Sequence, residues 1–234
     1  MSARRECPGA TTRSLWVGFG AWLLIGCGGA VPDEIARPVP DTVLELPAPR
    51  IEGDHALEAL LQRRRSIRDL RPDPLELADI GQLAWAAQGI TDEAGHRTAP
   101  SANAVYPLEL WVALPSGLHR YDPASHTLAR YDASDLREAI YETAYRQEVL
   151  RNAPAVFIVC GVFDRMATRF EASVAPRYVH LEAGHAAQNL LLQAVALDLA
   201  AVPIGGVDSY AMREALGLTL RETPLYAIPV GHPR

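Results

Sequence analysis

Apolar residues recur along the chain at two different periods. Spacings of three and four residues predict helices: one capped by Asp54 and ending near Arg64, one that starts after Asp73 and ends at Gly89, one over about 178–199 and one over 209–216. Short apolar or alternating runs predict strands over 108–114, 118–121, 127–131, 154–161 and 224–230. Because helices and strands are mixed without strict alternation, the pattern predicts an α+β fold.

The first 26 residues are typical of an export signal. Residues 1–13 hold three arginines and one glutamate, and residues 15–25 carry no charge. Leu24-Ile25-Gly26-Cys27 follows and resembles a bacterial lipobox. We therefore expect a signal peptide over 1–26 and a lipidated Cys27 that anchors the protein to the membrane on its extracytoplasmic, periplasmic side. An ordinary secretory signal is the alternative, and a misassigned start codon would leave the protein cytoplasmic. The Arg4-Arg5 pair leaves Sec and twin-arginine export open.

Composition divides the remaining chain into a tether and one domain. Residues 27–50 contain five prolines and predict an extended tether, and residues 51–234 predict a single domain. Apolar residues make up 49% of the chain and charged residues 21%, which is ordinary for a folded globular protein. The net charge of −6 gives no basic field, so no nucleic-acid partner is expected. Cys160 lies inside an apolar run and is expected to be a core residue.

Three polar segments could carry chemistry. Residues 63–68 place four guanidinium groups beside a hydroxyl, a set that suits a phosphate, although a solvated basic patch would have the same composition. Residues 98–107 form a loop of small polar residues that would let a flat ring approach the backbone, or would simply connect two elements. Residues 202–208 include paired glycines whose N–H groups can approach a ligand. His180 and His185 lie on different helix faces, so no metal site is expected.

Taken in order, these segments resemble the nitroreductase family of flavoproteins. The resemblance is greatest to its SagB-type branch, which includes the azoline dehydrogenases of thiazole and oxazole peptide maturation. It covers about residues 45–232, nearly the whole chain after the predicted signal. The segments that carry it are 60–70, 83–91, 97–110, 117–123, 177–189 and 224–226.

The resemblance implies an α+β sandwich, with a mixed sheet flanked by helices, that dimerises and binds FMN at the dimer interface. The first of three implied cofactor-binding segments would hold the phosphate and ribityl chain, with its last arginine near the pyrimidine edge of the ring. The second would line the ring, and backbone N–H groups of the third would point at N5 and O4. These residues are Arg64, Arg65, Ser66 and Arg68; Pro100, Ser101, Ala102 and Asn103; and Pro203, Ile204, Gly205 and Gly206.

Some features depart from the family pattern. Many members place an asparagine four residues after the loop proline, where this chain has Ala104, with Asn103 before it. Typical members continue into a basic tail, whereas here Arg234 is the one basic candidate near the end. The catalytic acid or base is unknown, because Tyr106, Tyr178 and His185 are candidates by residue type alone.

The resemblance implies an FMN-dependent oxidoreductase that moves two electrons as a hydride through flavin N5, to or from a small molecule or a peptide. The substrate and the electron donor, NADH, NADPH or another, stay open. An exported protein would need a donor other than cytosolic NAD(P)H. Azoline-type dehydrogenation of a peptide is one alternative. An exported flavin-binding or ligand-binding lipoprotein without turnover is another.

Overall fold

The computed structural model describes residues 37–234. The predicted signal peptide, Cys27 and the first part of the predicted tether lie outside the described residues. Within the described chain, no helix is both long enough and apolar enough to cross a membrane.

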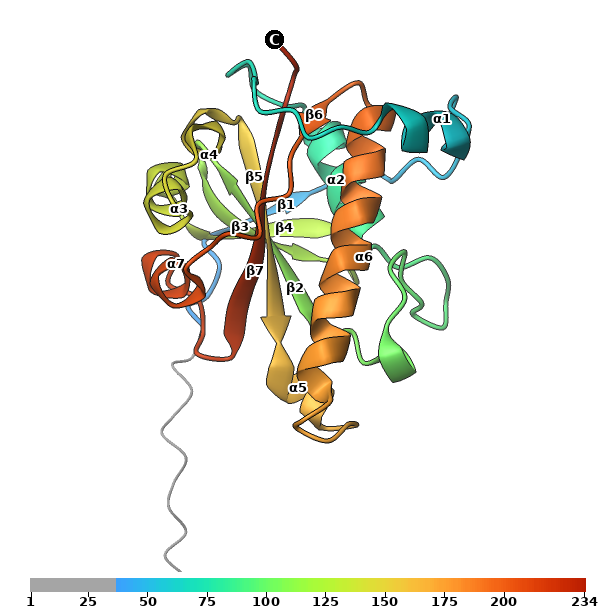
Figure 1. Cartoon of the computed structure of the whole chain (residues 1–234), viewed down its shortest axis with the longest axis vertical. Coiled ribbons are helices and arrows are strands. Elements are labelled where there is room, and N and C mark those ends of the chain that lie inside the picture. The colour runs from blue at the N-terminus through green and yellow to red at the C-terminus, as the bar shows by residue number, and fades with distance from the viewer. Residues whose placement is uncertain (1–36) are drawn as a thin grey trace, which may run out of the picture. The chain divides into compact units, whose positions relative to one another are not determined.

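A seven-stranded sheet forms the centre of the domain, with strand order β1-β4-β3-β2-β5-β7-β6 (Figure 1). All neighbouring strands pair antiparallel. The expectation of a mixed sheet is therefore wrong: the one parallel pairing among the described residues is an isolated bridge between Ser66 and Ala201. The strands are β1 (Thr42–Glu45), β2 (Leu108–Leu114), β3 (Gly117–Asp122), β4 (Thr127–Asp132), β5 (Ala155–Val162), β6 (Ala200–Ala201) and β7 (Glu222–Gly231).

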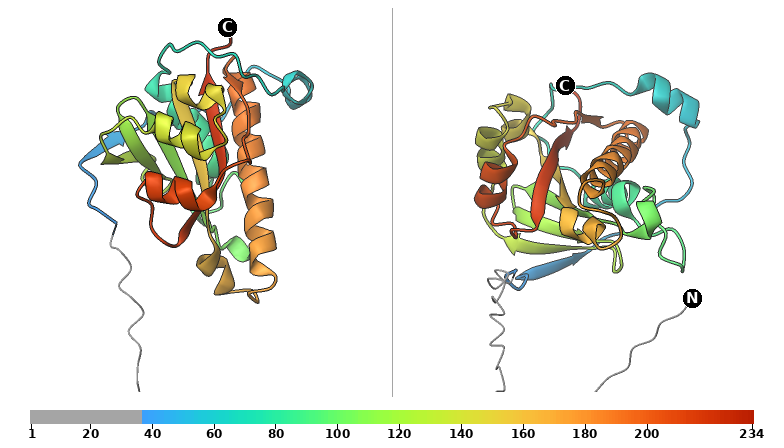
Figure 2. Two further views of the ribbon diagram at one scale, coloured as in Figure 1. Left: turned by 60° about the vertical axis from the view of Figure 1, so that its left-hand side comes forward. Right: turned by 60° about the horizontal axis from the view of Figure 1, so that its bottom comes forward.

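Helices cover both faces of the sheet. The long helix α6 packs with α2 on one face, and α3, α4 and α7 lie on the other (Figures 1 and 2). The bounds are α1 (Leu57–Arg63), α2 (Leu77–Gln88), α3 (Arg137–Thr143), α4 (Glu148–Asn152), α5 (Phe163–Ala167), α6 (Ala175–Ala196) and α7 (Ser209–Ala215), with a short 3₁₀ turn, η1 (Ala102–Ala104).

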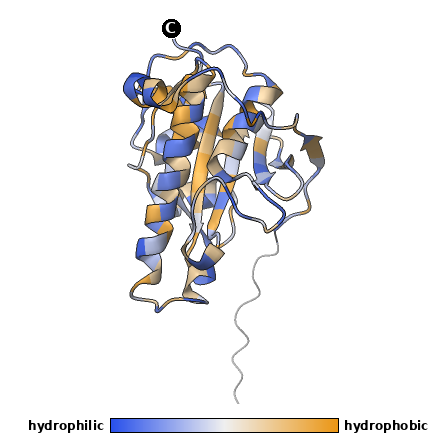
Figure 3. Cartoon of the chain, turned by 90° about the vertical axis from the view of Figure 1, so that its right-hand side faces the viewer, coloured by the Kyte–Doolittle hydropathy of each residue, from blue (hydrophilic) through white to orange (hydrophobic). Residues whose placement is uncertain are grey.

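Alternating strand residues supply the two cores between these layers. Phe157 and Val159 of β5 face the α2/α6 side, whereas Val156, Ile158 and Cys160 face the α3/α4/α7 side. Every residue of β5 is buried, as expected for a strand paired on both edges and covered on both faces. The expectation that Cys160 is a core residue is confirmed, and burial raises the pKa of its thiol. Helix α6 carries both polar and apolar residues along its length (Figure 3). Its buried residues recur at helical spacing, so the other face of this helix is exposed to solvent.

The five predicted strands form close to their expected bounds, and three expectations about boundaries are wrong. Part of the predicted tether belongs to the domain, because β1 pairs with β4 and the backbone of Arg50 exchanges two hydrogen bonds with the side-chain amide of Gln82. The helix expected after Asp73 begins only at Leu77, because Glu76 is extended and acts as the N-cap. Likewise α1 starts after Ala56, so Asp54 does not cap it.

Candidate functional site

The arginine-rich segment lies between β6 and the C-terminus. Leaving α1, its backbone is extended, Ser66 bridges Ala201, and the Ile67 N–H donates to the Ala201 carbonyl at 3.2 Å. Further along, Leu70 bridges Pro233 and the Arg71 N–H donates to the carbonyl of His232 at 2.9 Å. This double attachment fixes residues 64–71 along one edge of the molecule, which we call the cationic edge.

Side chains on this edge alternate in direction, as in a strand. Arg65 lines a hollow of about 320 Å³ and donates at 2.8 Å to the carbonyls of Gln62 and Arg64. Arg68 instead lines a hollow of about 260 Å³ together with Arg234. Arg65 and Arg68 thus face different hollows, although both are expected at one cofactor.

The guanidinium groups of the cationic edge differ in whether they form hydrogen bonds or ion pairs. Arg64 and Arg68 make no side-chain hydrogen bond or ion pair with any residue from 37 to 234, and Ser66 is exposed. Arg234 pairs with Asp69 at 2.9 Å, which holds the C-terminal cation beside the segment. Free guanidinium groups at an exposed edge can bind an anion without first breaking a bond.

The glycine pair begins four residues beyond β6, the strand that Ser66 contacts. Ile204 exchanges two backbone hydrogen bonds with Ala227, at 2.9 and 3.0 Å, which fixes this segment against β7. Gly205 and Gly206 are exposed, and their N–H groups have no hydrogen-bond partner in the part of the chain that the structure describes. Two further donors are therefore open in the segment that follows β6.

Aromatic rings flank both glycines. A Cβ at Gly205 would lie 3.4 Å from the Tyr226 ring, and one at Gly206 would lie 3.5 Å from the ring of Tyr145. A hollow of about 340 Å³ is lined by Gly205, Tyr226 and His180 of α6, among others. The glycines thus let a ligand approach a backbone that larger residues would cover.

The third predicted segment, Pro100–Asn103, lies elsewhere. Its loop is fixed to α2 and α6, because Thr98 Oγ1 donates to the Trp85 carbonyl at 3.1 Å and Asn189 donates to the Thr98 carbonyl at 3.0 Å. Figure 1 shows this stretch beside the lower half of α6, while α1 lies near the upper end of that helix. No hydrogen bond or ion pair within residues 37–234 joins Pro100–Asn103 to the other two segments.

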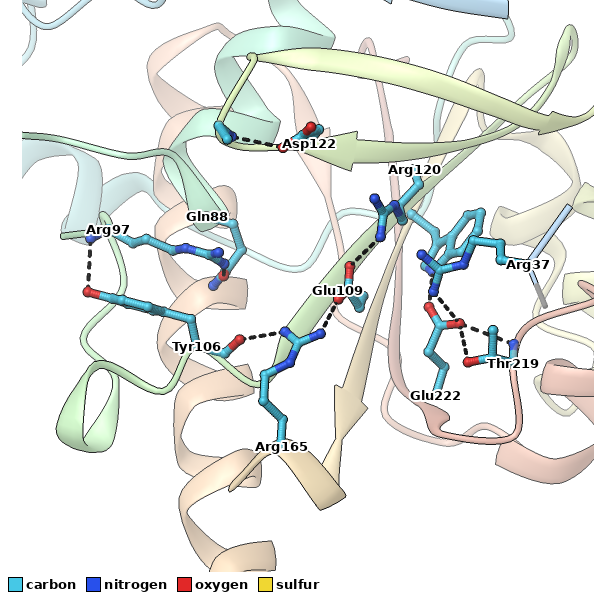
Figure 4. Close-up of polar contacts among 12 residues, drawn as sticks. Arg37, Gln88, Arg97, Tyr106, Glu109, Arg120, Asp122, Arg165, Thr219 and Glu222 are labelled. Atoms are coloured by element: carbon cyan, nitrogen blue, oxygen red, sulfur yellow. Dashed lines mark hydrogen bonds and ion pairs between the residues drawn. The ribbon is translucent and has the colours of Figure 1, made fainter. Parts of the chain in front are cut away.

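A cluster of charged residues surrounds the base of this loop (Figure 4). Arg165 donates to the Tyr106 carbonyl at 2.7 Å and forms an ion pair with Glu109, which also pairs with Arg120 at 3.3 Å. Arg97 donates to Gln88 Oε1 at 2.7 Å and lies 4.6 Å from the centre of the Tyr106 ring. Each arginine of this cluster is engaged, unlike Arg64 and Arg68.

Glu182 of α6 completes the cluster and was missed by sequence reasoning. Its side chain is buried, and burial raises its pKa to about 7, while a hydrogen bond from Ser101 and the charges of Arg97 and Arg165 act to lower the pKa. The position of Glu182 in the sequence could have indicated its burial, because it lies on the same helical face as the apolar residues Val179, Ala183 and Ala186. A charge inside such a stripe is rarely buried without a purpose.

The other candidates fall outside these two regions. Tyr178 stacks on Phe170 with ring centres 4.6 Å apart, and His185 is exposed on α6. Among residues 37–234, no three His, Cys, Asp or Glu side chains are grouped to hold a metal ion.

Comparison with known proteins defines the class. Residues 61–232 match the nitroreductase family, and the chain therefore belongs to this family of flavin-binding oxidoreductases. It is 36% identical over 194 residues to the inferred nitroreductase MJ1384 of Methanocaldococcus jannaschii, a match covering 80% of this chain and 96% of that protein. Its fold is similar to a crystal structure of an inferred nitroreductase of Ralstonia eutropha JMP134, with a TM-score of 0.75, 30% identity and coverage of 84% and 94% of the two chains.

Two more distant structures share the fold. A nitroreductase-like protein of Desulfovibrio desulfuricans, solved in complex with FMN, superimposes with a TM-score of 0.59 and 22% identity, covering 77% of this chain and 87% of that one. The Escherichia coli microcin synthetase complex McbBCD, with truncated pro-MccB17 bound, contains a chain with a TM-score of 0.64 and 17% identity, covering 79% and 76%.

The donor set fits a flavin nucleotide. The unengaged Arg64 and Arg68 and the exposed Ser66 hydroxyl suit an anionic phosphate, and the open N–H groups of Gly205 and Gly206 suit the acceptor atoms of a flat ring. The two sets are connected through β6, since Ser66 bridges Ala201 and the chain continues from this strand to the glycines.

Proposed function

We propose that this protein is an FMN-dependent oxidoreductase that transfers two electrons as a hydride, through flavin N5, to or from a small molecule or a peptide. The observation that carries the proposal is a combination of open donors: the side chains of Arg64 and Arg68 and the N–H groups of Gly205 and Gly206 have no hydrogen-bond partner among residues 37–234. Groups at the surface are hydrated while no ligand is bound, so these donors are available to an anion and to the acceptor atoms of a ring without first breaking a protein contact.

Each group has a defined part in this proposal. Arg64, Arg65 and Ser66 bind the phosphate and ribityl chain of the cofactor, and Arg68 approaches the pyrimidine edge of the ring. Arg234 adds positive charge from the C-terminus. The N–H groups of Gly205 and Gly206 donate to the pyrimidine side of the ring, where they stabilise the negative charge of the reduced form. FMN supplies the hydride chemistry, while the protein supplies binding and orientation.

We also propose that the protein forms a homodimer. Pro100–Asn103 lies apart from the other two segments within one chain, so a homodimer in which the partner supplies this loop would join all three. Helix α1 supports this arrangement, since none of its residues is buried and Leu57 and Leu61 are 57% and 52% exposed. Apolar side chains on a projecting helix indicate a protein contact.

Membrane anchoring through Cys27, on the periplasmic side, is the part of the proposal that rests on sequence alone. It would place the enzyme apart from cytosolic NAD(P)H and favour another electron donor. Mass spectrometry of the protein from its native host tests this part: a lipidated N-terminal Cys27 supports it, and an intact Met1 contradicts it.

The visible absorption spectrum of the purified full-length protein tests the main proposal, with the released cofactor identified by mass. We expect about one FMN per chain, a dimer by light scattering, and bleaching of the flavin band by at least one of NADH, NADPH or a quinol donor. A colourless protein that takes up no added FMN contradicts the proposal. Bound FMN that dithionite reduces, but no biological donor does, would favour the alternative of a flavin-binding protein without turnover.

A further inference from the structure

A hollow of about 340 Å³ lies beside Gly205, and one imidazole lines it. The hollow is lined by Gly205, by Leu225 and Tyr226 of β7 and by His180 of α6, among others. Among residues 37–234, no carboxylate or arginine side chain lines it. Ligand sites in proteins are usually apolar hollows with a small number of polar groups, and this hollow has that composition.

Packing at the first turns of α6 holds the imidazole at this hollow. The His180 ring lies against the Phe163 ring, with ring centres 5.4 Å apart. Phe163 meets Leu225 over Gly161 of β5, where an added Cβ would lie 3.2 Å from Phe163 and 3.1 Å from Leu225. His180 therefore stands where α6 and α5 meet the Leu225 end of β7.

The opposite side of the hollow is formed by the glycine segment. Tyr226 follows Leu225 in β7, and its ring lies 3.4 Å from the position of an added Cβ at Gly205. The Gly205 N–H has no hydrogen-bond partner in the part of the chain that the structure describes. A ligand that accepts a hydrogen bond from this N–H would therefore lie next to the hollow that His180 lines.

The imidazole of His180 is free to change its protonation state. Within residues 37–234, its side chain forms no hydrogen bond or ion pair, and the residue is exposed. The Ser209 hydroxyl at the same hollow is instead engaged, since it donates to the Pro224 carbonyl at 2.7 Å. Because imidazole gains or loses a proton near neutral pH, His180 can exchange protons with water without first breaking a protein contact.

Few other groups near the hollow could exchange a proton. Tyr226 is the other titratable side chain among the described residues that line it. The charged groups on the surrounding elements are Arg177, one turn before His180 on α6, Asp164 on α5 and Asp208, the N-cap of α7. None of these three charged residues lines the hollow.

We propose that His180 is the proton-accepting residue of the flavin site: its imidazole binds a proton from water when the ring is reduced and returns it when the ring is reoxidised. This inference rests on the proposed function, which places the ring beside Gly205. Two-electron reduction of a flavin adds two electrons and one proton and leaves one negative charge on the ring. An imidazolium within about 4–6 Å balances that charge, and the negative charge in turn raises the proton affinity of the imidazole. The electrons come from an external donor such as a quinol and leave to an external acceptor such as a quinone.

The pH dependence of the flavin midpoint potential tests the proposal, because its slope gives the number of protons bound per two electrons. We would titrate the FMN-loaded full-length protein spectroelectrochemically between pH 6 and 8.5, as wild type and as His180→Gln, whose side chain cannot titrate. At its maximum, the wild type should bind about half a proton more per two electrons than His180→Gln, because a tenfold higher proton affinity in the reduced state changes the protonated fraction by that amount. Equal proton uptake by the two proteins at every pH overturns the proposal.

His185→Gln provides the matched control. His185 is also an exposed histidine of α6, but it lies five residues further along, on a different face of the helix, and does not line the hollow. Its proton uptake should equal that of the wild type. A loss as large as in His180→Gln would overturn the proposal, because it would mean that any surface imidazole of α6 has this effect.

Modification by diethyl pyrocarbonate, followed by mass spectrometry, gives a second readout that involves no electron transfer. Bound FMN should slow the modification of His180 several-fold and leave that of His185 unchanged, and equal slowing of both, or of neither, overturns the inference. This measurement uses the wild type, so it decides even if His180→Gln fails to fold. A protein that binds no FMN contradicts the proposed function and this inference together. Bound FMN with the same proton uptake in wild type and His180→Gln contradicts the inference alone.

Discussion

The arginines of two regions of the molecule differ in their side-chain contacts. Along the cationic edge, Arg64 and Arg68 are unengaged by any residue from 37 to 234. Around the base of the 100–106 loop, Arg97 and Arg165 are bound to Gln88, Glu109 and the Tyr106 backbone. Arginine side chains therefore lack protein contacts where a ligand is expected, and they form hydrogen bonds and ion pairs where they support the loop.

The difference has an electrostatic basis. An exposed guanidinium group is solvated by water and loses little free energy while it waits for an anion, whereas a half-buried one must be paired to offset the loss of hydration. Arg97 shows the second case, since burial lowers its pKa. Substitutions in the two regions should therefore affect different properties: ligand affinity at the edge, and stability or loop conformation at the cluster.

The largest expected effect belongs to the edge. The double substitution Arg64→Ala and Ser66→Ala removes a free guanidinium group and an exposed hydroxyl, and we expect FMN affinity to fall about 100-fold. Hydrogen bonds between charged groups contribute about 1.5–3 kcal/mol each, and about 2.7 kcal/mol corresponds to this factor. The unfolding free energy should stay almost unchanged, because neither side chain packs in the core. Flavin fluorescence titration measures the affinity, and urea denaturation measures the stability.

Arg146→Ala provides the matched control for this prediction. Arg146 is an exposed arginine in an ion pair with Glu142 on the surface. It should alter neither FMN affinity nor stability beyond about 0.5 kcal/mol. Unchanged affinity in the edge double variant would show that the phosphate binds elsewhere.

The second effect belongs to the cluster and concerns stability. Because the pKa of Glu182 is raised from 4.5 to about 7, the folded state binds a proton that the unfolded state has already released between these pH values. Wild-type stability should therefore fall as the pH rises from 4.5 to 7, on the order of 2 kcal/mol, and then level off. Glu182→Gln should lack this decline, which urea denaturation at pH 5 and pH 8 measures. Parallel curves for the two proteins would mean that Glu182 is already ionised at pH 5.

The same contrast explains what the sequence could predict. The spacing of apolar residues correctly predicted β2 and the long helix α6, because these elements bury defined faces and the burial determines the spacing. The tether boundary failed because β1 has only four residues between prolines and gains its pairing from distant β4. Residues 64–68 and 203–206 could be proposed as neighbours only through the resemblance. The Glu182 cluster could not be predicted at all, because its charged members lie on a loop, two helices and two strands that only tertiary folding brings together.

The smallest expected effect tests whether the open N–H groups of Gly205 and Gly206 contribute as much to FMN binding as the arginines of the cationic edge. In Gly206→Ala, the new methyl group would lie 3.5 Å from the Tyr145 ring, an ordinary contact distance, so the fold should tolerate it within about 1 kcal/mol. The methyl group stands beside an N–H that has no partner in the described chain, and it should hinder a flat ring from approaching the backbone. We expect FMN affinity to fall by about threefold to tenfold, less than in the arginine variant, because contact distance is lost and no charge is removed. Gly53→Ala, where the added Cβ meets nothing within 4 Å, should leave FMN affinity unchanged. If Gly206→Ala binds FMN as tightly as Gly53→Ala does, the ring lies away from this segment, and the edge holds the cofactor by its phosphate alone.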